Sequence, residues 1–370
     1  MTLDVNHEAF LALVRAGLWE QEIQLFPFQE FDLSEVYHIS ENQAVFGIVA
    51  VGLEYVCDIK VPQEAALAFA GVALQLEQRN KAMNVFIAEL LQNMQKAGIY
   101  SLLLKGQGIA QCYKRPLWRT CGDVDLLLSP DEYKKAAKLL SPLASRINDE
   151  DNIRKHLAMV IGTWDVELHG TLRTGLWSSI DMTLDQVQDD VFCGVVRSWM
   201  NNDTQVFLLG ADEDLFLVFS HILQHFFVEG IGLRQICDWC RHLYTFHDSV
   251  NNKLLEKRLK KAGILLEWKV FAAMAVDYLG MDENYIPFYD SAGIYHRKAQ
   301  VVLQLLFKTG NFGYSRSKSY KTKYSTIMRY VISFCRHTKD AFWRFQCFPR
   351  HSICIWFRIM WKGVTTSDVK

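Results

Sequence analysis

Two aspartates separated by one residue lie within an otherwise apolar run of the chain. Successive side chains of a β-strand point to opposite faces, so Asp123 and Asp125 would share one face of a strand. Carboxylates are ligands that Mg²⁺ prefers in proteins, and Mg²⁺ in turn binds phosphates. A third carboxylate from a neighbouring strand would complete a site for two Mg²⁺ ions about 3.5–4 Å apart. We expect Glu167 in that position and Asp165 as the second choice, because both lie on the polar face of a predicted strand, 164–169.

A turn with two glycines comes before these aspartates. Lys105, Gly106, Gln107 and Gly108 follow a short apolar run. A glycine lets the backbone approach a phosphate without a Cβ atom in between. Lys105 and Arg119 are either surface charges or phosphate ligands, and Arg119 has the geometry for a bidentate contact. We predict that these five residues bind the phosphates of a nucleotide.

More polar residues are predicted to line a cleft beside the carboxylates. His221 and His225 are four residues apart on a predicted helix, but the glutamate of an HExxH zinc motif is absent, so we favour a structural pair that faces the site. His169 is expected to donate an orienting hydrogen bond or to be structural rather than to bind metal. Arg234 and Asp238 lie on the next helix and are expected to contact the base or the acceptor. The predicted cleft residues are Asp165, His169, His221, His225, Arg234 and Asp238.

The pattern of apolar residues predicts an α+β fold, with a small mixed sheet between two helical regions. Helical periodicity dominates both before and after the segment that carries the carboxylates. Ser129, Pro130 and Glu132 form a capping signal for a helix inside that segment. The predicted strands are 99–104, 123–128, 156–161 and 164–169. The predicted division of the chain is 1–97 (helical), 98–205 (α/β core), 206–310 (helical) and 311–370 (basic and aromatic).

Composition limits the class of protein. Half of the 370 residues are hydrophobic, which excludes a disordered chain. The longest apolar run has ten residues, too few to span a bilayer, and the first residues do not resemble a signal peptide. Cys237 and Cys240 form a lone CxxC and are predicted to be buried structural thiols. Reduced cysteines favour a cytoplasmic protein.

The charge is concentrated near the C-terminus. The chain has a net charge of −1, whereas residues 315–370 contain twelve Lys or Arg and two Asp or Glu. Aromatic residues alternate with these basic residues. The segment is a solvated tail, an amphipathic helix packed on the domain beside it, or a surface that binds an anionic membrane or nucleic acid. The membrane alternative would make the protein peripheral to the membrane.

The order of apolar strand, glycine turn and two alternating aspartates resembles the polymerase-β-type nucleotidyltransferase superfamily. Within it, the segments LLLKGQG, YKRPLWRTCGDVDLLL and DVELHG are similar to a bacterial family described as uncharacterised nucleotidyltransferases, and the resemblance covers about residues 30–280. It implies that the α/β segment is a nucleotidyltransferase core. It also implies that Asp123 and Asp125 bind metal, that Glu167 is the third acidic residue and that Gly106 is the turn glycine.

These observations together predict a Mg²⁺-dependent nucleotidyltransferase. The acceptor would attack the α-phosphate of an NTP, and pyrophosphate would leave. A sugar phosphate, a protein side chain and a small metabolite all remain open as acceptors. Because Gln107 stands where the superfamily usually has Gly or Ser, the main alternative is an inactive member that serves as a scaffold and docks through its basic C-terminal segment. A third interpretation is a transferase that modifies nucleic-acid ends.

Overall fold

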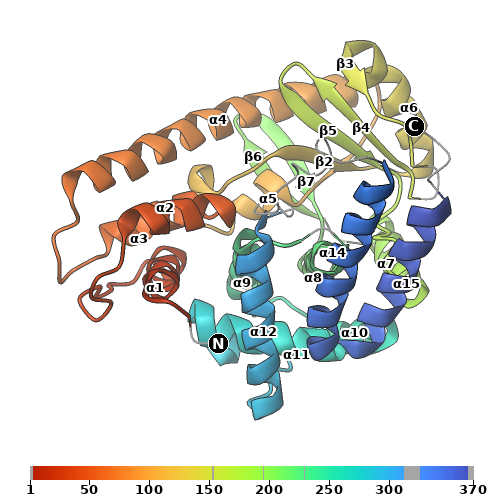
Figure 1. Cartoon of the computed structure of the whole chain (residues 1–370). Coiled ribbons are helices and arrows are strands. Elements are labelled where there is room, and N and C mark those ends of the chain that lie inside the picture. The colour runs from red at the N-terminus through yellow and green to blue at the C-terminus, as the bar shows by residue number, and fades with distance from the viewer. Residues whose placement is uncertain (1–2, 152–153, 195, 229, 312–325, 366–370) are drawn as a thin grey trace.

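The computed structural model describes residues 3–151, 154–194, 196–228, 230–311 and 326–365 (Figure 1). A sheet lies in the upper part of the view, a long helix runs beside it, and most other helices gather below it. The helices before the sheet and beside it are α1 (Val5–Trp19), α2 (Leu33–Asn42), α3 (Phe46–Glu54), α4 (Gln63–Lys96), α5 (Gly106–Ala110) and α6 (Pro130–Leu140). The later ones are α7 (Ser178–Cys193), α8 (Ala211–Val228), α9 (Leu233–Phe246), α10 (Asn252–Ala262), α11 (Leu265–Leu279), α12 (Gly293–Thr309), α14 (Thr326–Cys347) and α15 (Pro349–Thr365).

Seven strands form one mixed sheet in the order β3-β4-β5-β2-β1-β7-β6. The pairs β2/β5 and β1/β7 are parallel, and the other neighbours are antiparallel. The bounds are β1 (Leu102–Leu104), β2 (Asp123–Leu127), β3 (Ala144–Ile147), β4 (His156–Ile161), β5 (Trp164–His169), β6 (Arg197–Asn201) and β7 (Thr204–Leu208). The predicted combination of a mixed sheet with flanking helices is therefore confirmed.

The sheet is larger than the sequence pattern indicated. The strands β3, β6 and β7 were not predicted, and the predicted core boundary at residue 205 falls inside β7, which pairs with β1. β6 and β7 form a hairpin whose turn contains Asn202 with φ 51°, a left-handed conformation that asparagine tolerates. The core segment therefore extends at least to Leu208.

The two faces of the sheet have different surroundings. On one face, alternate residues of β2 and β5 are fully buried against α4 and α6, namely Val124, Leu126, Val166 and Leu168. The opposite face of the sheet carries Asp123 and Asp125 of β2, together with the other alternate residues of β5. Around it, Leu102, Leu104 and Leu127 join a second core that includes residues of α1, α3, α8, α9 and α11. One apolar face thus anchors the strands, and the other face is left to carry polar groups.

Helix α4 holds the connection between β1 and β2 in place. The buried amide of Asn80 donates hydrogen bonds to the carbonyl oxygens of Leu117 and Arg119, each at 2.8 Å. These residues lie in or just after a short 3₁₀ helix, η1 (Pro116–Trp118). Gly47 of α3 touches the same segment so closely that a Cβ atom there would lie 1.9 Å from the carbonyl oxygen of Trp118. The loop that leads into β2 is therefore fixed from two sides.

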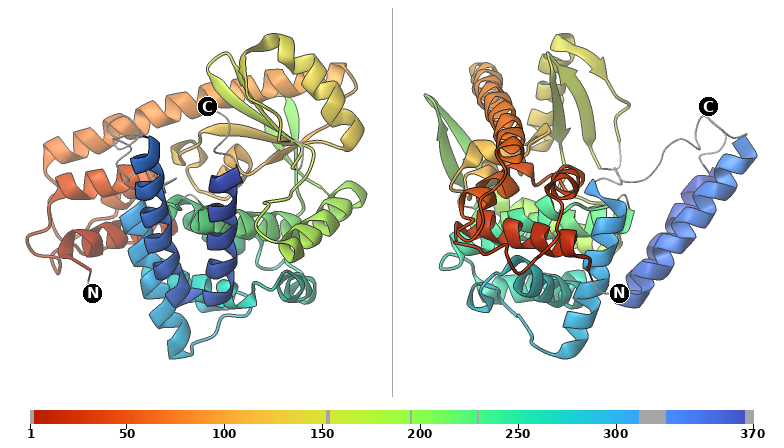
Figure 2. Two further views of the ribbon diagram at one scale, coloured as in Figure 1. Left: turned by 45° about the vertical axis from the view of Figure 1, so that its right-hand side comes forward. Right: turned by 60° about the vertical axis from the view of Figure 1, so that its left-hand side comes forward.

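The described part of the predicted basic segment forms two helices, α14 and α15, which lie side by side against the helical region (Figures 1 and 2). At their junction Phe348 is buried, and the ring of His351 stacks on Trp177 with centroids 3.9 Å apart. His351 Nδ1 also lies 2.6 Å from a carboxylate oxygen of Glu267. Of the alternatives for this segment, packing on the neighbouring domain is thus observed for the described residues. Residues 312–325 and 366–370 lie outside them.

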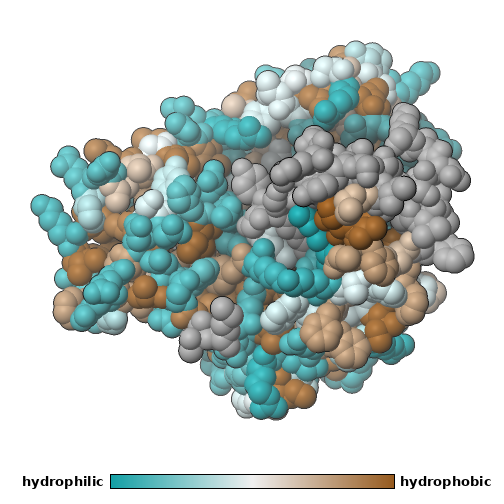
Figure 3. All heavy atoms as spheres, in the orientation of Figure 1, coloured by the Kyte–Doolittle hydropathy of each residue, from teal (hydrophilic) through white to brown (hydrophobic). Residues whose placement is uncertain are grey.

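The outer surface of these two helices is partly apolar. Phe334, Phe342 and Phe357 are at least half exposed, and Figure 3 shows hydrophobic surface on the face where α14 and α15 lie. Among the described residues, no helix is long and apolar enough to cross a membrane. The two cysteines of the CxxC, Cys237 and Cys240, are fully buried in α9, as predicted.

The close contact at Gly47 gives a stability prediction. A Cβ atom there would overlap the backbone of Trp118, so Gly47→Ala should lower the free energy of unfolding by about 1–3 kcal/mol. Gly71 is a matched control within α4, where an added Cβ atom meets nothing within 4 Å. Gly71→Ala should stabilise the protein by up to about 1 kcal/mol because alanine is the better helix former. Urea denaturation followed by circular dichroism measures both, and equal midpoints for the two variants would contradict the packing described.

Candidate active site

Three carboxylates meet where β2 and β5 run side by side. The parallel register sets Asp125 opposite Glu167 and Asp123 opposite Asp165. One carboxylate oxygen from each of Asp123, Asp125 and Glu167 lies within 4.8 Å of the other two. The convergence expected from the sequence is therefore observed, and oxygen atoms so arranged suit a divalent cation.

Negative charge exceeds positive charge at this point. Asp125 is 2% exposed, and its Oδ1 lies 2.8 Å from His169 Nε2 and 3.2 Å from Lys105 Nζ. The neighbouring charge of Asp125 raises the pKa of Asp123, and burial raises it further. A raised carboxyl pKa means that nearby positive charge does not fully balance the negative charge of ionised Asp123. A bound cation would relieve this repulsion.

Two histidines approach the third carboxylate. Nε2 of His156 lies 2.9 Å from Glu167 Oε2, and Nε2 of His169 lies 3.6 Å from the same oxygen. Burial acts to raise the pKa of Glu167, but the hydrogen bond with His156 and the nearby His169 outweigh it and lower that pKa well below the ordinary range. Burial likewise acts to lower the pKa of His169, and its contacts with Asp125 and Glu167 raise it instead. Glu167 is therefore ionised at neutral pH.

The turn before α5 directs Lys105 toward the carboxylates. Lys105 has φ 49° and ψ −137°, an unusual conformation for a residue with a side chain, and Gly106 follows with φ 43°. Burial acts to lower the pKa of Lys105, but the charges of Asp125, Asp123 and Glu167 raise it. The strained turn thus holds a charged ammonium group against the acidic cluster.

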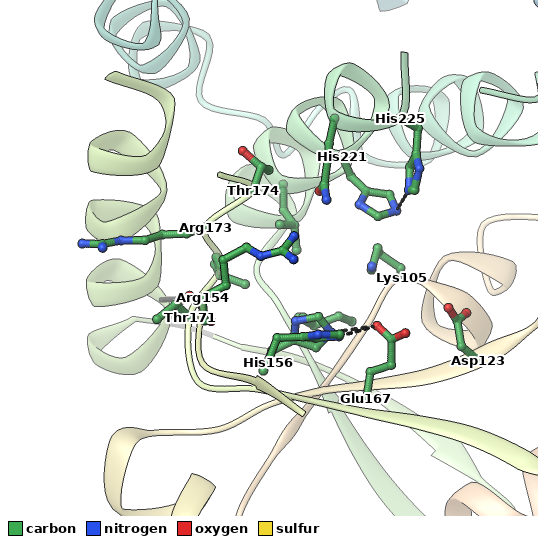
Figure 4. Close-up of a pocket in the computed structure, with 15 residues that line it drawn as sticks. Lys105, Asp123, Arg154, His156, Glu167, Thr171, Arg173, Thr174, His221 and His225 are labelled. Atoms are coloured by element: carbon green, nitrogen blue, oxygen red, sulfur yellow. Dashed lines mark hydrogen bonds and ion pairs between the residues drawn. The ribbon is translucent and has the colours of Figure 1, made fainter. Parts of the chain in front are cut away.

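A cavity of ≈ 310 Å³ opens beside the cluster, between the sheet and α8 (Figure 4). Arg154 directs its guanidinium group into this space from the side away from Asp123, whereas Arg173 points outward to the exposed carboxylate of Asp185. The volume is within the usual range for small-molecule sites. The polar residues that line it are Lys105, Asp123, Arg154, His156, Glu167, His169, Thr171, Arg173, Thr174, His221, Gln224 and His225.

A smaller cavity of ≈ 50 Å³ also borders the cluster, and Lys105, Asp123 and His221 line both spaces. Its remaining polar lining is Arg119, Asp125, Arg234, Gln235 and Asp238. The acidic cluster therefore borders both cavities, with Asp123 in the lining of each.

The comparison with known families agrees with this geometry. A family model described as uncharacterised nucleotidyltransferase matches residues 29–280, about two thirds of the chain. The chain belongs to this nucleotidyltransferase family. No curated protein and no solved structure gives a significant match. The family membership expected from the turn, the aspartate pair and the later Glu-Leu-His strand is confirmed.

Most of the cleft residues predicted for this chain lie at the two cavities. His221 and His225 face the larger cavity as a pair, with their Nε2 atoms 2.8 Å apart. Burial and the charge of Lys105 hold the pKa of His221 well below its usual value, so this ring is neutral. Arg234 and Asp238 line the smaller cavity, as expected for residues of one cleft.

Arg119 requires a correction. Its guanidinium group is buried and bonded to Asp238, with Nε 3.0 Å from Oδ1 and Nη2 2.6 Å from Oδ2. The hydroxyl of Tyr113 donates to the same carboxylate at 2.8 Å. The bidentate contact that was predicted for a phosphate is thus made with Asp238. Nη1 of Arg119 has no hydrogen-bond partner among the described residues, so one donor remains for a ligand.

Gln107, Gly108 and Asp165 also differ from expectation. The buried amide of Gln107 donates to Asn80 Oδ1 of α4 at 2.9 Å, away from the carboxylates. The close approach of β7 leaves no room for a side chain at Gly108: a Cβ atom there would lie 2.8 Å from Leu208 Cδ2. The Asp165 side chain is 65% exposed and lies 4.0 Å from Arg146. Of the turn residues, Lys105 and Gly106 are the ones that line a cavity near the cluster.

Sequence reasoning missed His156 and Arg154 as site residues. His156 begins a strand that was predicted with the correct bounds, and it pairs with His169 across β4 and β5. Once this antiparallel register is known, the alternation of side chains along β4 places His156 on the same polar face of the sheet as His169. Arg154 lies just before β4, where strand periodicity no longer says in which direction a side chain points.

The buried ion pair gives a second stability prediction. Asp238→Asn removes the charge that compensates Arg119, and leaving a buried charge unpaired typically costs about 3–5 kcal/mol. The matched control is Asp165→Asn, whose exposed side chain should change stability by less than about 0.5 kcal/mol. Urea midpoints of the two variants provide the measurement. A small loss for Asp238→Asn would mean that Arg119 has another source of compensation.

The excess charge at Asp123 gives a prediction about pH. The folded state binds the Asp123 proton more tightly than the unfolded state, so the penalty from its ionisation is absent at low pH. It grows as pH rises from the ordinary pKa of 3.8 and is complete above the raised value. Metal-free Asp123→Asn should therefore be more stable than the parent protein at neutral pH, and the difference should shrink in mild acid. Urea denaturation at both pH values tests this, and a parent protein that is the more stable at neutral pH would contradict it.

Proposed function

We propose that this protein transfers a nucleotidyl group from an NTP to an acceptor and releases pyrophosphate, in a reaction that depends on Mg²⁺. The observation that carries the proposal is the convergence of Asp123, Asp125 and Glu167 from two parallel strands beside a polar cavity. Membership of the nucleotidyltransferase family supports the reaction class.

The donor set fits magnesium. Three carboxylates offer hard oxygen ligands. The raised pKa of Asp123 indicates that the neighbouring positive groups do not fully balance the negative charge of these carboxylates. When bound, Mg²⁺ would neutralise the phosphates and polarise the attacking oxygen. Asp123, Asp125 and Glu167 would hold it. Lys105 already lies against Asp125 and would add positive charge for the phosphates of the NTP.

The sizes of the two cavities suggest how substrates divide between them. The larger space, ≈ 310 Å³, is in the range for a nucleotide, whereas ≈ 50 Å³ admits only a small group or water. We therefore assign the NTP to the larger cavity, with its phosphates between Lys105 and Arg154. The free donor of Arg119 in the smaller cavity is available to an oxygen of either substrate.

The reaction itself needs alignment more than acid–base chemistry. The acceptor oxygen or nitrogen forms a bond to the α-phosphorus while the bond to the bridging oxygen of pyrophosphate breaks, and the acceptor gives up its proton to solvent. Positioned cations and a rigid site lower the barrier because they are in place before charge moves to the leaving group. The buried position of Asp125 and the anchoring of the loop before β2 by Asn80 provide this rigidity. The acceptor class remains open among hydroxyl and amine compounds.

Pyrophosphate release tests the proposal. The metal-free protein is incubated with each of the four NTPs and Mg²⁺, together with extracts fractionated by size as a source of acceptor. Release is expected only with metal, and Asp125→Asn should reduce it at least about 100-fold because it removes a buried ligand. Circular dichroism and a urea curve show whether the variant is folded.

The matched control is again Asp165→Asn, on the same strand as Glu167 and opposite Asp123 in register. Its exposed carboxylate is not one of the three that converge, so pyrophosphate release should stay within about twofold of the parent protein, as is usual for surface changes. Nucleotide binding without turnover in every NTP and acceptor fraction would favour the alternative of an inactive binding protein. Equal loss in both variants would contradict the assignment of the carboxylates.

A further inference from the structure

His156, Glu167 and His169 form a second potential ligand set that overlaps the carboxylate cluster. One ligand atom from each lies within 4.8 Å of the other two. The antiparallel register pairs His156 with His169 and Ala158 with Glu167, so the two histidines and the glutamate share one face of the sheet. Both Nε2 atoms approach the same carboxylate oxygen, at 2.9 and 3.6 Å. Nitrogen and oxygen donors thus converge on one point of the cavity wall.

The chemistry of this set differs from that of the aspartates. Two imidazole nitrogens and one carboxylate oxygen are the donors found at catalytic zinc and non-haem iron sites. Mg²⁺ prefers oxygen ligands and binds imidazole poorly by comparison. We propose that His156, Glu167 and His169 bind a transition-metal dication of the Zn²⁺, Fe²⁺ or Co²⁺ class, next to the Mg²⁺ site.

Glu167 would connect the two sites. Figure 4 shows its carboxylate between His156 on one side and Asp123 on the other. A carboxylate has two oxygens and can serve two ions at once. Three protein ligands also leave coordination positions open, and these positions face the larger cavity, because all three residues line it. An oxygen of a phosphate or of a hydroxyl acceptor is the kind of ligand that would fill them.

This interpretation revises the role expected for His169 from the sequence. The ring of His156 is held by Glu167 and that of His169 by Asp125, so both Nε2 atoms are turned toward the carboxylates, at 2.9 and 2.8 Å. Metal binding requires a neutral imidazole whose ligating nitrogen carries no proton. A role of this ion in nucleotidyl transfer rests on the proposed function, whereas the binding of the ion to these three residues does not depend on it.

Cobalt is the probe for the test, because its visible absorption reports nitrogen ligands. The metal-free full-length protein is titrated with Co²⁺ in excess Mg²⁺, without nucleotide, by absorption spectroscopy and isothermal titration calorimetry. The expected result is one Co²⁺ site with nitrogen ligation that excess Mg²⁺ does not displace. His156→Gln and His169→Gln should each weaken Co²⁺ binding at least about 10-fold. Glutamine keeps an amide donor for the neighbouring carboxylate, so a merely structural histidine would tolerate the change.

Two controls separate this site from its surroundings. His221→Gln alters a histidine of the same cavity that comes from α8, and Asp123→Asn alters the aspartate site; both should retain Co²⁺ affinity within about threefold, since neither removes a proposed ligand. Unchanged Co²⁺ affinity in the folded His156→Gln and His169→Gln proteins would overturn the proposal. So would an equal loss in Asp123→Asn, because Co²⁺ binding would then depend on the aspartate site as much as on the histidines.

The outcome is independent of catalysis. Pyrophosphate release with Mg²⁺ in a protein that fails to bind Co²⁺ would keep the proposed function and remove the second metal. Co²⁺ binding that depends on both histidines, in a protein that releases no pyrophosphate, would keep the metal site and remove the reaction.

Discussion

The pairing of Asp125 with Glu167 on two parallel strands is the constraint around which the site is built, because it brings three carboxylates within 4.8 Å of one another. Like charges at such distances repel strongly where water is excluded, and this repulsion raises the pKa of Asp123. Lys105 and the two histidines of β4 and β5 offset part of the repulsion. The protein thus keeps a local destabilising feature that only a ligand of opposite charge can fully compensate, which is typical of sites selected for binding rather than for stability.

Such a cluster persists because the same strands are anchored from behind. Because side chains alternate along a strand, the residues next to those that face the cavity point to the other face of the sheet. There Val124, Leu126, Val166 and Leu168 pack on α4 and α6. Helix α4 then adds a polar anchor, since Asn80 binds both Gln107 and the loop before β2. The turn at Lys105 can therefore keep an unfavourable backbone conformation, because the elements on either side of it are fixed independently.

The part of this site that could be predicted from the sequence is the part that depends on local periodicity. Alternation within one strand placed Asp123 and Asp125 together, and the bounds of β4 and β5 were predicted correctly. What periodicity does not contain is the order and register of strands, and His156 was missed for that reason. Gly108 and Arg119 were assigned to phosphate from their types alone, but tertiary contacts use the first for packing against Leu208 and the second for pairing with Asp238.

The arrangement of positive groups explains how the site can be stable without metal and still bind it. Lys105 and His169 both approach Oδ1 of Asp125, at 3.2 and 2.8 Å, and His156 approaches Glu167 at 2.9 Å. The ammonium group sits on a flexible stem and can move to a phosphate when a cation takes its place, whereas the imidazoles are held by the strands and can exchange only a proton for a metal. The two kinds of positive group therefore respond differently to a cation. Lys105 gives up a counter-charge, and the histidines supply ligands, which is the physical basis for expecting two unlike ions at one shared glutamate.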